Sequence, residues 1–598
     1  MPRPAPVDAA VTDAAVTDAD IDDAAVEPAT WGQPLVPLAA VSVGNAEIIE
    51  VSAADDGRFV ACGAREGLVV VDARDPAAPV VAPRAQTELD GASYFRCTHV
   101  TLGGTTAYVT FRADSTGPSF LAAFELGATA VISAAYAAPA ERVLASSVVR
   151  GDAVITAMLR EGLGVFTREG RALVQRGALG GLTDAQGLDL VGATLYVADG
   201  AGGLAVVDAS DPLAMRVVGR VSTGGVAQIV AVDAARSMAY VSGSTGVVIV
   251  DVSRPAAPAV AGRIAQAAPV GQLAVADGRL YVAASRDLRV YSLDDPRRPR
   301  RVAVARPTNP GTFTRVRGVA VRGDVVALAD WGRFETYRAR RGFAAPYLDV
   351  PDEPLSFGRV AAGAARRAFV TVENLGLAPA ARVVAAVDGS AFAVSPAEFS
   401  LGVGESRELQ IDFSAPDEAP RVGALRLATG GVEPAAASLA LSANARGVEP
   451  GDVAPDESAS LTDGRAWRSA DERGHPLLMA YFSTWCPVCG FELPYLEANV
   501  WERFRARGLA VVGVAPPVSA GPRPDNLDDV RAFARHGGLT FPMGPSPTNT
   551  YAEMIQGRGD NNTPFPLLAL VDRAGRLTYL AVTLDPPGLT RAIEDALR

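Results

Sequence analysis

A chain of 598 residues is too long for one compact core, because a single domain usually contains about 100–200 residues, so about three to five domains are expected. Hydrophobic residues make up 49% of the chain and charged residues 20%, as in globular proteins. The 67 acidic residues outnumber the 55 basic residues, all of them arginine, and a net charge of −12 without a basic stripe disfavours nucleic-acid binding. No window of about 20 residues is uniformly apolar, so no transmembrane segment is expected.

Residues 1–31 form a tail of small and acidic residues with the near repeat D-A-A-V-T-D-A-A-V-T-D-A-D. The tail lacks the branched and aromatic residues that offset the entropy of ordering, so we expect it to be disordered. It has no basic start followed by an apolar segment, so no signal peptide is expected in the sequence as written. One hypothesis is that the true start lies upstream and includes an export or lipoprotein signal. The alternative is a cytoplasmic protein with a disordered tail.

Residues 32–343 repeat a unit in which a turn and an apolar run are followed by a second run that ends in Asp and a Pro-marked turn. Short β-branched runs between Gly, Asp and Pro turns are typical of strands, and a period of about 40–47 residues fits one four-stranded propeller blade. We predict a seven-bladed β-propeller whose last unit takes its outer strand from residues 33–43, which closes the ring. The first turn of the unit starts at Gly57, Gly104, Gly151, Gly192, Arg236, Gly278 and Gly323.

The second run of the unit has a recurring form, L-V-V-V-D-A-R-D-P at residues 68–76 and L-A-V-V-D-A-S-D-P at residues 204–212. Residues 247–255 (V-V-I-V-D-V-S-R-P) and 288–296 (L-R-V-Y-S-L-D-D-P) follow the same pattern. These units resemble the LVIVD-repeat propeller family. The resemblance supports the fold and implies little about a ligand.

Residues 347–446 form a second all-β region without this repeat. Apolar and polar residues alternate in F-V-T-V-E-N-L-G (369–376) and L-Q-I-D-F (409–413), as in half-buried strands. With F-G-R-V-A-A-G (357–363), the region resembles the Ig-like sandwiches of the ASPM/SPD-2/Hydin group. Such sandwiches serve as spacers or adhesion modules.

The last region, residues 448–598, contains the motif that carries chemistry. The apolar run 476–483 is typical of a central strand of a two-sided sheet, and it leads directly into T-W-C-P-V-C-G-F-E-L-P (484–494). A helix is predicted over 495–507 and a second buried strand over 509–515. The order strand, C-x-x-C, helix, strand is the context of a thioredoxin-type redox site, so we predict an α/β thioredoxin fold.

The spacing of the two cysteines explains their predicted roles. Two cysteines three positions apart at a helix start can form a disulfide with little backbone movement. Free backbone N–H groups and the helix dipole stabilise a thiolate on the first, so Cys486 is predicted to be the nucleophile. Cys489, one turn further in and more shielded, is predicted to resolve the mixed disulfide. Pro487 suits the first helical turn, and Trp485 is expected to pack beside the sulfurs and limit solvent access.

This region resembles the TlpA/ResA-type thioredoxin-like reductases in three segments, residues 451–457 (G-D-V-A-P-D-E), 481–494 and 565–572 (F-P-L-L-A-L-V-D). The alignment implies that the cis-proline of that family falls on Pro566, with Pro564 as the second choice.

Glu492 matches the acidic position of the TlpA/ResA family, although on an amphipathic helix it could equally be solvated. Glu457 stands where that family has an aromatic residue, and the loop before Thr563 is more polar. Both departures bear on which substrate the domain binds more than on whether it exchanges disulfides.

The cysteines could also serve a structural role, in a zinc site or in an inert disulfide. A zinc site needs four ligands, but no second C-x-x-C is present and the histidines, His99, His475 and His536, are scattered, so neither a metal nor a cofactor is expected. An inert structural disulfide is the other alternative. Cys62 and Cys97 fall on predicted inner strands of the first two blades and could pair if their Cα atoms come within about 7 Å, but buried free thiols are favoured.

The sequence therefore favours a thiol–disulfide oxidoreductase that acts on disulfide-containing proteins, with the propeller and Ig-like domains binding or positioning partners. The resemblance implies a reductase in the periplasm or at the cell surface, re-reduced by a membrane electron donor of the DsbD type. The alternative is an extracytoplasmic binding or scaffold protein whose propeller is the working part and whose thioredoxin-like domain is structural. The direction of electron flow, the physiological substrate and the oligomeric state stay open.

Overall fold

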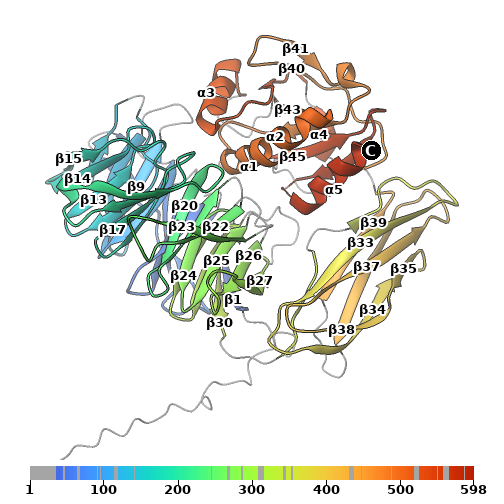
Figure 1. Ribbon diagram of the computed structural model, residues 1–598, viewed down its shortest axis with the longest axis horizontal. Helices are drawn as coiled ribbons and strands as arrows, with labels where there is room; N and C mark the ends of the chain where they lie inside the picture. The colour runs from blue at the N-terminus through green and yellow to red at the C-terminus, as the bar shows by residue number, and fades with distance from the viewer. Residues whose placement is uncertain are drawn as a thin grey trace, which may run out of the picture.

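The computed structural model describes residues 35–598, so the predicted disordered tail lies outside the described residues. Gaps in the described range fall at 45–47, 64–66, 90–91, 94–95, 113–118, 140–141, 244–245, 265–269, 285–286, 308–315, 331, 341–344, 352–354, 430–436, 446, 487, 518–523, 549, 556–564, 583 and 585. Three parts follow one another along the chain, coloured blue to green, yellow, and orange to red in Figure 1.

The first part consists of four-stranded antiparallel units. Two of them, β8–β11 and β12–β15, are joined into one sheet by a single parallel bridge between β11 and β15. The described strands give seven such units: β2 (Ile48–Ala53), β3 (Arg58–Gly63), β4 (Gly67–Asp72), β5 (Val80–Val81); β8 (Cys97–Gly103), β9 (Thr106–Arg112), β10 (Ser119–Leu126), β11 (Ala130–Ala137); β12 (Ser147–Arg150), β13 (Ala153–Ala157), β14 (Leu163–Glu169), β15 (Ala172–Leu179); β16 (Gly187–Val191), β17 (Thr194–Ala198), β18 (Leu204–Asp208), β19 (Arg216–Val221); β20 (Ala227–Asp233), β21 (Met238–Gly243), β22 (Gly246–Asp251), β23 (Ala259–Ile264); β24 (Leu273–Ala276), β25 (Arg279–Ala284), β26 (Asp287–Ser292), β27 (Arg300–Ala305); and β28 (Val316–Arg322), β29 (Val325–Asp330), β30 (Arg333–Ala339) with β1 (Leu35–Ser42). A small hairpin, β6 (Glu88–Leu89) and β7 (Ala92–Ser93), follows the first unit.

The first strands of these units contact one another in cyclic order, β2, β8, β12, β16, β20, β24 and β28, and β28 contacts β2 again. β1 pairs with β30 as the outer strand of the last unit, the pairing predicted for residues 33–43. Neighbouring units share apolar side chains; Phe59 of the first unit and Phe334 of the last have ring centroids 5.6 Å apart. The strands thus form a propeller-like ring.

The second part has two sheets around one apolar core. One sheet has the order β31 (Leu348–Asp349), β33 (Ala365–Asn374), β37 (Ser406–Ser414), β35 (Phe392–Ser395); the other has β32 (Leu355–Ser356), β39 (Ala437–Ala443), β38 (Arg421–Thr429), β34 (Ala380–Asp388), β36 (Glu398–Leu401). Phe357, Phe392 and Phe413 pack together in the core with ring centroids 5.0–5.8 Å apart. The region is therefore a β-sandwich, and its Ig-like character stays a prediction.

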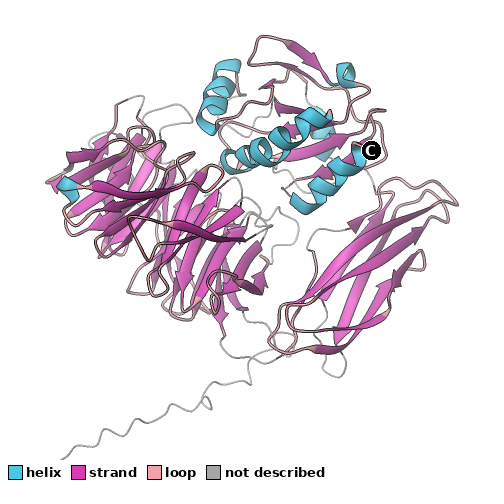
Figure 2. Cartoon of the chain, viewed as in Figure 1, coloured by secondary structure: helices cyan, strands magenta, loops and turns pink. Residues whose placement is uncertain are grey.

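The third part is an α/β domain, and most of the helices lie here (Figure 2). Its central sheet has the order β44 (Met543–Pro545), β43 (Ala510–Ala515), β42 (Leu477–Tyr481), β45 (Leu567–Val571), β46 (Leu577–Ala581), and a hairpin of β40 (Ser458–Ser460) and β41 (Ala466–Arg468) precedes it. β42, β43 and β44 are parallel, whereas β45 and β46 are antiparallel to their neighbours. The helices are α1 (Cys489–Leu496), α2 (Glu502–Phe504), α3 (Leu527–Gly537), α4 (Thr550–Ile555) and α5 (Pro586–Ala596).

The helix predicted over 495–507 begins earlier. α1 starts at Cys489 and continues through a π-helical segment, Glu497–Trp501, into α2 and a last turn that ends at Gly508 in the left-handed region (φ 94°). Pro494 lies inside α1 and lacks the N–H of a regular helix, and the π-helical segment begins three residues later, at Glu497. The strands predicted over 476–483 and 509–515 are present with slightly narrower bounds.

Arginine side chains connect the three parts. Arg301 pairs with Asp349 (3.1 Å) and Glu373 (2.5 Å), between the ring and the sandwich. Arg359 of the sandwich pairs with Asp452 of the α/β domain (3.2 Å) and donates to the carbonyl oxygen of Ala445. Among the helices in the described ranges, none has the length and apolar character required to cross a membrane.

Candidate active site

The cysteine pair lies where the central strand β42 passes into α1. Cys486 is 4% exposed, and the backbone N–H of Cys489 donates to its Sγ at 3.2 Å. The two Sγ atoms are 2.6 Å apart, close enough for a bond to form with little movement. Negative charge is stabilised on a sulfur that accepts a hydrogen bond from a backbone N–H at the amino end of a helix, because the free N–H groups and the helix dipole are positive there.

Cys489 lies deeper and is fully buried. Burial, and then the hydrogen bond and charge of Cys486, hold the pKa of the Cys489 thiol well above its usual value. The Cys489 thiol therefore holds its proton more tightly than an ordinary thiol, and Cys486 is the sulfur nearer the surface.

The segment before β45 faces the first sulfur. The peptide bond between Phe565 and Pro566 is cis, and the Cys486 thiol donates to the carbonyl oxygen of Phe565 at 3.6 Å. The Trp485 ring meets the Phe565 ring edge-on, with centroids 5.9 Å apart, so both rings lie beside the cysteines. Pro487 and Pro564 lie outside the described residues.

Glu492 is fully buried, so the interpretation of a solvated helix face is wrong for this side chain. It follows Cys489 by three positions, which places both on one side of α1. After burial and the neighbouring Cys486, the charge of Glu492 also raises the pKa of Cys489.

Asp525, which no sequence motif singles out, holds the loop in front of Cys486. Its carboxylate accepts hydrogen bonds from the Ser483 hydroxyl (2.7 Å), from the Thr484 backbone N–H (2.9 Å) and from the Thr484 hydroxyl. Asp525 directly precedes Asn526, whose side chain caps α3. The run P-D-N before an amphipathic helix signals a helix start, but nothing in it indicates a partner 41 residues away.

Cys62 of β3 and Cys97 of β8 form a disulfide, with Cα atoms 5.3 Å apart, so the expectation of free thiols is wrong. The reason is that β3 and β8 belong to adjacent units whose strands contact each other in the ring. Within the described residues, no group of three or more His, Cys, Asp or Glu side chains has the arrangement of a metal site.

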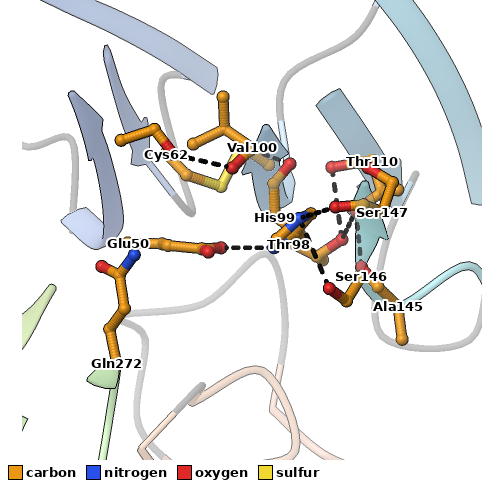
Figure 3. Close-up of polar contacts among 12 residues, drawn as sticks. Glu50, Cys62, Thr98, His99, Val100, Thr110, Ala145, Ser146, Ser147 and Gln272 are labelled. Carbon is orange, nitrogen blue, oxygen red and sulfur yellow. Dashed lines mark hydrogen bonds and ion pairs between the residues drawn. A yellow bond between two sulfur atoms is a disulfide. The ribbon is translucent and has the colours of Figure 1, made fainter. Parts of the chain in front are cut away.

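His99 lies near this disulfide and joins three units of the ring (Figure 3). Its Nδ1 is 2.9 Å from the Glu50 carboxylate, and its Nε2 is 3.0 Å from the backbone carbonyl oxygen of Ser147. Both neighbours accept hydrogen bonds, so the ring carries a proton on each nitrogen. Ser146 Oγ lies 3.4 Å from Nε2, as in a Ser–His–Glu arrangement, but a protonated Nε2 cannot act as a base toward it. Below its folded-state pKa, His99 is therefore a structural cation.

Known proteins resemble two regions of the chain. Residues 450–580 match the AhpC/TSA family, and residues 183–223 and 224–266 each match the LVIVD repeat. Thiol-disulfide oxidoreductase ResA of Geobacillus thermodenitrificans (strain NG80-2) is 28% identical over 130 residues, which are 22% of this chain and 67% of ResA. Thioredoxin-like protein YneN of Bacillus subtilis (strain 168) is 33% identical over 97 residues, 16% of this chain and 54% of YneN.

Solved structures also match parts of the chain. A thiol:disulfide interchange protein of the thioredoxin family from Chlorobium tepidum TLS covers 26% of this chain and 99% of its own length at 24% identity, with a TM-score of 0.21. The WD40 β-propeller domain of Doa1 covers 51% of this chain and 98% of its own length at 12% identity, with a TM-score of 0.39. From the family matches and the ResA relatives, the chain has a thioredoxin-like domain of the AhpC/TSA family at its carboxyl end, homologous to ResA, and carries LVIVD repeats in its amino-terminal region.

Proposed function

We propose that Cys486 and Cys489 carry out thiol–disulfide exchange on disulfide-containing proteins, acting as a reductase. The observation that carries the proposal is the pair of sulfurs 2.6 Å apart at the amino end of α1, the first in contact with Phe565 and the second buried. Similarity to ResA over 130 residues supports the same chemistry.

The exchange takes two steps. The Cys486 thiolate attacks one sulfur of the substrate disulfide, a mixed disulfide forms, and the other substrate sulfur leaves and takes up a proton. Cys489 then loses its proton and attacks Cys486 Sγ. The second substrate sulfur leaves as a thiolate and takes up a proton, and a Cys486–Cys489 disulfide remains. The substrate has gained two electrons and two protons. We assign Glu492, which is buried on the same helix, as the group that takes up the proton from Cys489.

A membrane electron donor of the DsbD type then returns the Cys486–Cys489 disulfide to the dithiol. Trp485 and Phe565 limit water at the sulfurs, since their rings lie beside each other there. Pro566 is the cis-proline of the site, and we assign the backbone next to it to pairing with the extended substrate chain.

The other regions are assigned to partner binding or positioning. Residues 32–343 would be a seven-bladed β-propeller, residues 347–446 an Ig-like sandwich and residues 448–598 the thioredoxin-like domain. An extracytoplasmic location, in the periplasm or at the cell surface, is supported by the Cys62–Cys97 disulfide, because disulfides persist in oxidising compartments.

Reduction of insulin by the full chain tests the proposal. The wild type with a dithiol electron source should precipitate insulin chains, whereas Cys486→Ser should lose this activity, because the remaining Cys489 lies deeper than Cys486 and its raised pKa keeps it a thiol. The double variant Cys62→Ala, Cys97→Ala is the matched control and should keep the activity. Unchanged turnover in Cys486→Ser would show that the proposal is wrong.

A further inference from the structure

Glu457, which stands where related reductases are expected to have an aromatic residue, is the centre of a buried hydrogen-bond cluster. Its side chain is 1% exposed. Oε1 accepts hydrogen bonds from the Ser546 hydroxyl (2.6 Å), the Thr548 hydroxyl and the Ser458 backbone N–H (2.8 Å), and Oε2 accepts one from the Thr550 hydroxyl. One carboxylate thus fixes the chain from Ser546 to the start of α4.

The cluster extends from α4 to the central strand. Thr550 is the first residue of α4, and its hydroxyl also lies 3.2 Å from the hydroxyl of Tyr481, the last residue of β42. The next residue, Tyr551, packs on the Tyr481 ring with centroids 5.7 Å apart. Burial, and then the charge of Glu457, raise the pKa of Tyr481 well above its usual value.

From α4 the contacts reach the redox pair. The Tyr551 ring lies 4.8 Å from the Phe565 ring, centroid to centroid. The Phe565 carbonyl oxygen accepts a hydrogen bond from the Cys486 thiol, and the Phe565 ring contacts the Trp485 ring. Each contact in this series is between buried or half-buried groups, so a shift of α4 displaces the Phe565 segment against the sulfurs.

We propose that Glu457 is a positioning residue for thiol–disulfide exchange: through Thr550 and Tyr551 it holds the Phe565–Pro566 segment in place against Cys486. This inference rests on the proposed function. Glu457 does not touch the reacting sulfurs, and its effect is on the surface that meets the substrate.

Steady-state kinetics of the full-length Glu457→Gln variant test the inference. The amide keeps the size of the side chain but replaces one acceptor oxygen with a donor, so the three hydroxyls and the N–H can no longer all be satisfied. With insulin as substrate, kcat/KM should fall about tenfold, mainly through KM, because a misplacement of about 1 Å costs about 100-fold and the displacement expected here is smaller. The redox midpoint of the Cys486–Cys489 couple should stay at the wild-type value, since the end of α1 is unchanged.

Glu497 provides the matched control. It is also a buried glutamate, 7% exposed, whose carboxylate accepts hydrogen bonds from the Thr540 backbone N–H (2.7 Å), the Phe541 backbone N–H (3.2 Å) and the Thr540 hydroxyl. Among the described residues, the hydrogen bonds of the Glu497 carboxylate go to Thr540 and Phe541 and not to the Phe565 segment. Glu497→Gln should lower the melting temperature as Glu457→Gln does, with wild-type KM for the folded enzyme.

A second pair keeps the test decisive if Glu457→Gln does not fold. Thr550→Val removes the hydroxyl and should raise KM, whereas Thr550→Ser keeps the hydroxyl and should behave like the wild type. If both Glu457→Gln and Thr550→Val are less stable but have wild-type KM and kcat, Glu457 is merely structural and the inference is overturned. Inactive wild-type protein would instead overturn the proposed function itself.

Discussion

Removing the Cys62–Cys97 disulfide should destabilise the ring by about 4 kcal/mol. The bond joins residues separated by 35 positions, and the loss of chain entropy for a loop of this length is about 13 cal/mol/K, which at 25 °C corresponds to this free energy. For a ring of about 300 residues, the unfolding entropy is about 0.6 kcal/mol/K, so the melting temperature should fall by about 6 °C. Alanine is the better replacement, because both sulfurs are buried and a serine hydroxyl there would need a partner.

Differential scanning calorimetry of the double variant Cys62→Ala, Cys97→Ala measures this change, and hydrogen exchange of peptides from β3 and β8 assigns the transition to the ring. The same ring transition should be unaffected in the double variant Cys486→Ala, Cys489→Ala, which serves as the control. If the ring transition moves by less than about 1 °C after loss of the bond, the entropic reasoning fails for this protein.

Three further substitutions test the site and the ring. Asp525→Asn should slow insulin reduction by about fivefold, because the Asp525 carboxylate holds the loop before Cys486 through hydrogen bonds from Ser483 and Thr484. Initial rates from a stopped assay measure this change. Burial alone would lower the pKa of His99, but the Glu50 carboxylate outweighs burial and the pKa in the folded protein is raised. Protonated His99 therefore stabilises the ring fully below pH 6.5, and this contribution should be lost as the pH rises through the pKa of His99 in the folded state. Urea unfolding of the ring should show this loss in the wild type and not in His99→Gln. Burial raises the pKa of Asp189 to about 6, so Asp189→Asn should stabilise the ring by up to about 3 kcal/mol at pH 8 and by nothing at pH 3, as measured by the same unfolding assay.

The core of the site could be predicted because its elements are consecutive in the chain. An apolar strand, two cysteines and a helix follow one another, so local pattern alone places Cys486 and Cys489 at a helix start. The start of this helix is harder to predict from the sequence, because Gly490 and Pro494 fall in its first turns and both residue types disfavour a helix. In the structure, tertiary packing overrides that preference, since Leu493 and Leu496 of α1 are fully buried.

The supporting contacts could not be predicted because they join residues that are distant in the chain. The Phe565 carbonyl and the Cys486 thiol are 79 positions apart, and Asp525 and Thr484 are 41 apart. The burial of Glu492 likewise depends on what packs on α1 and not on the periodicity of the helix itself.

The disulfide of the ring illustrates the same limit. The repeat places Cys62 and Cys97 on strands of adjacent units, but whether the sulfurs meet depends on how the ring curves between those units. The Cα separation of 5.3 Å is a result of that packing and has no local signal in the sequence.

Mass spectrometry of a trapped adduct tests whether Cys486 attacks the substrate and Cys489 resolves the mixed disulfide. The full-length Cys489→Ala variant, incubated with a disulfide-containing peptide, should accumulate a mixed disulfide because the resolving thiol is missing. Tandem fragmentation should place the bound peptide on Cys486. An adduct absent from Cys486, or one that is released as fast as in the wild type, would contradict the account.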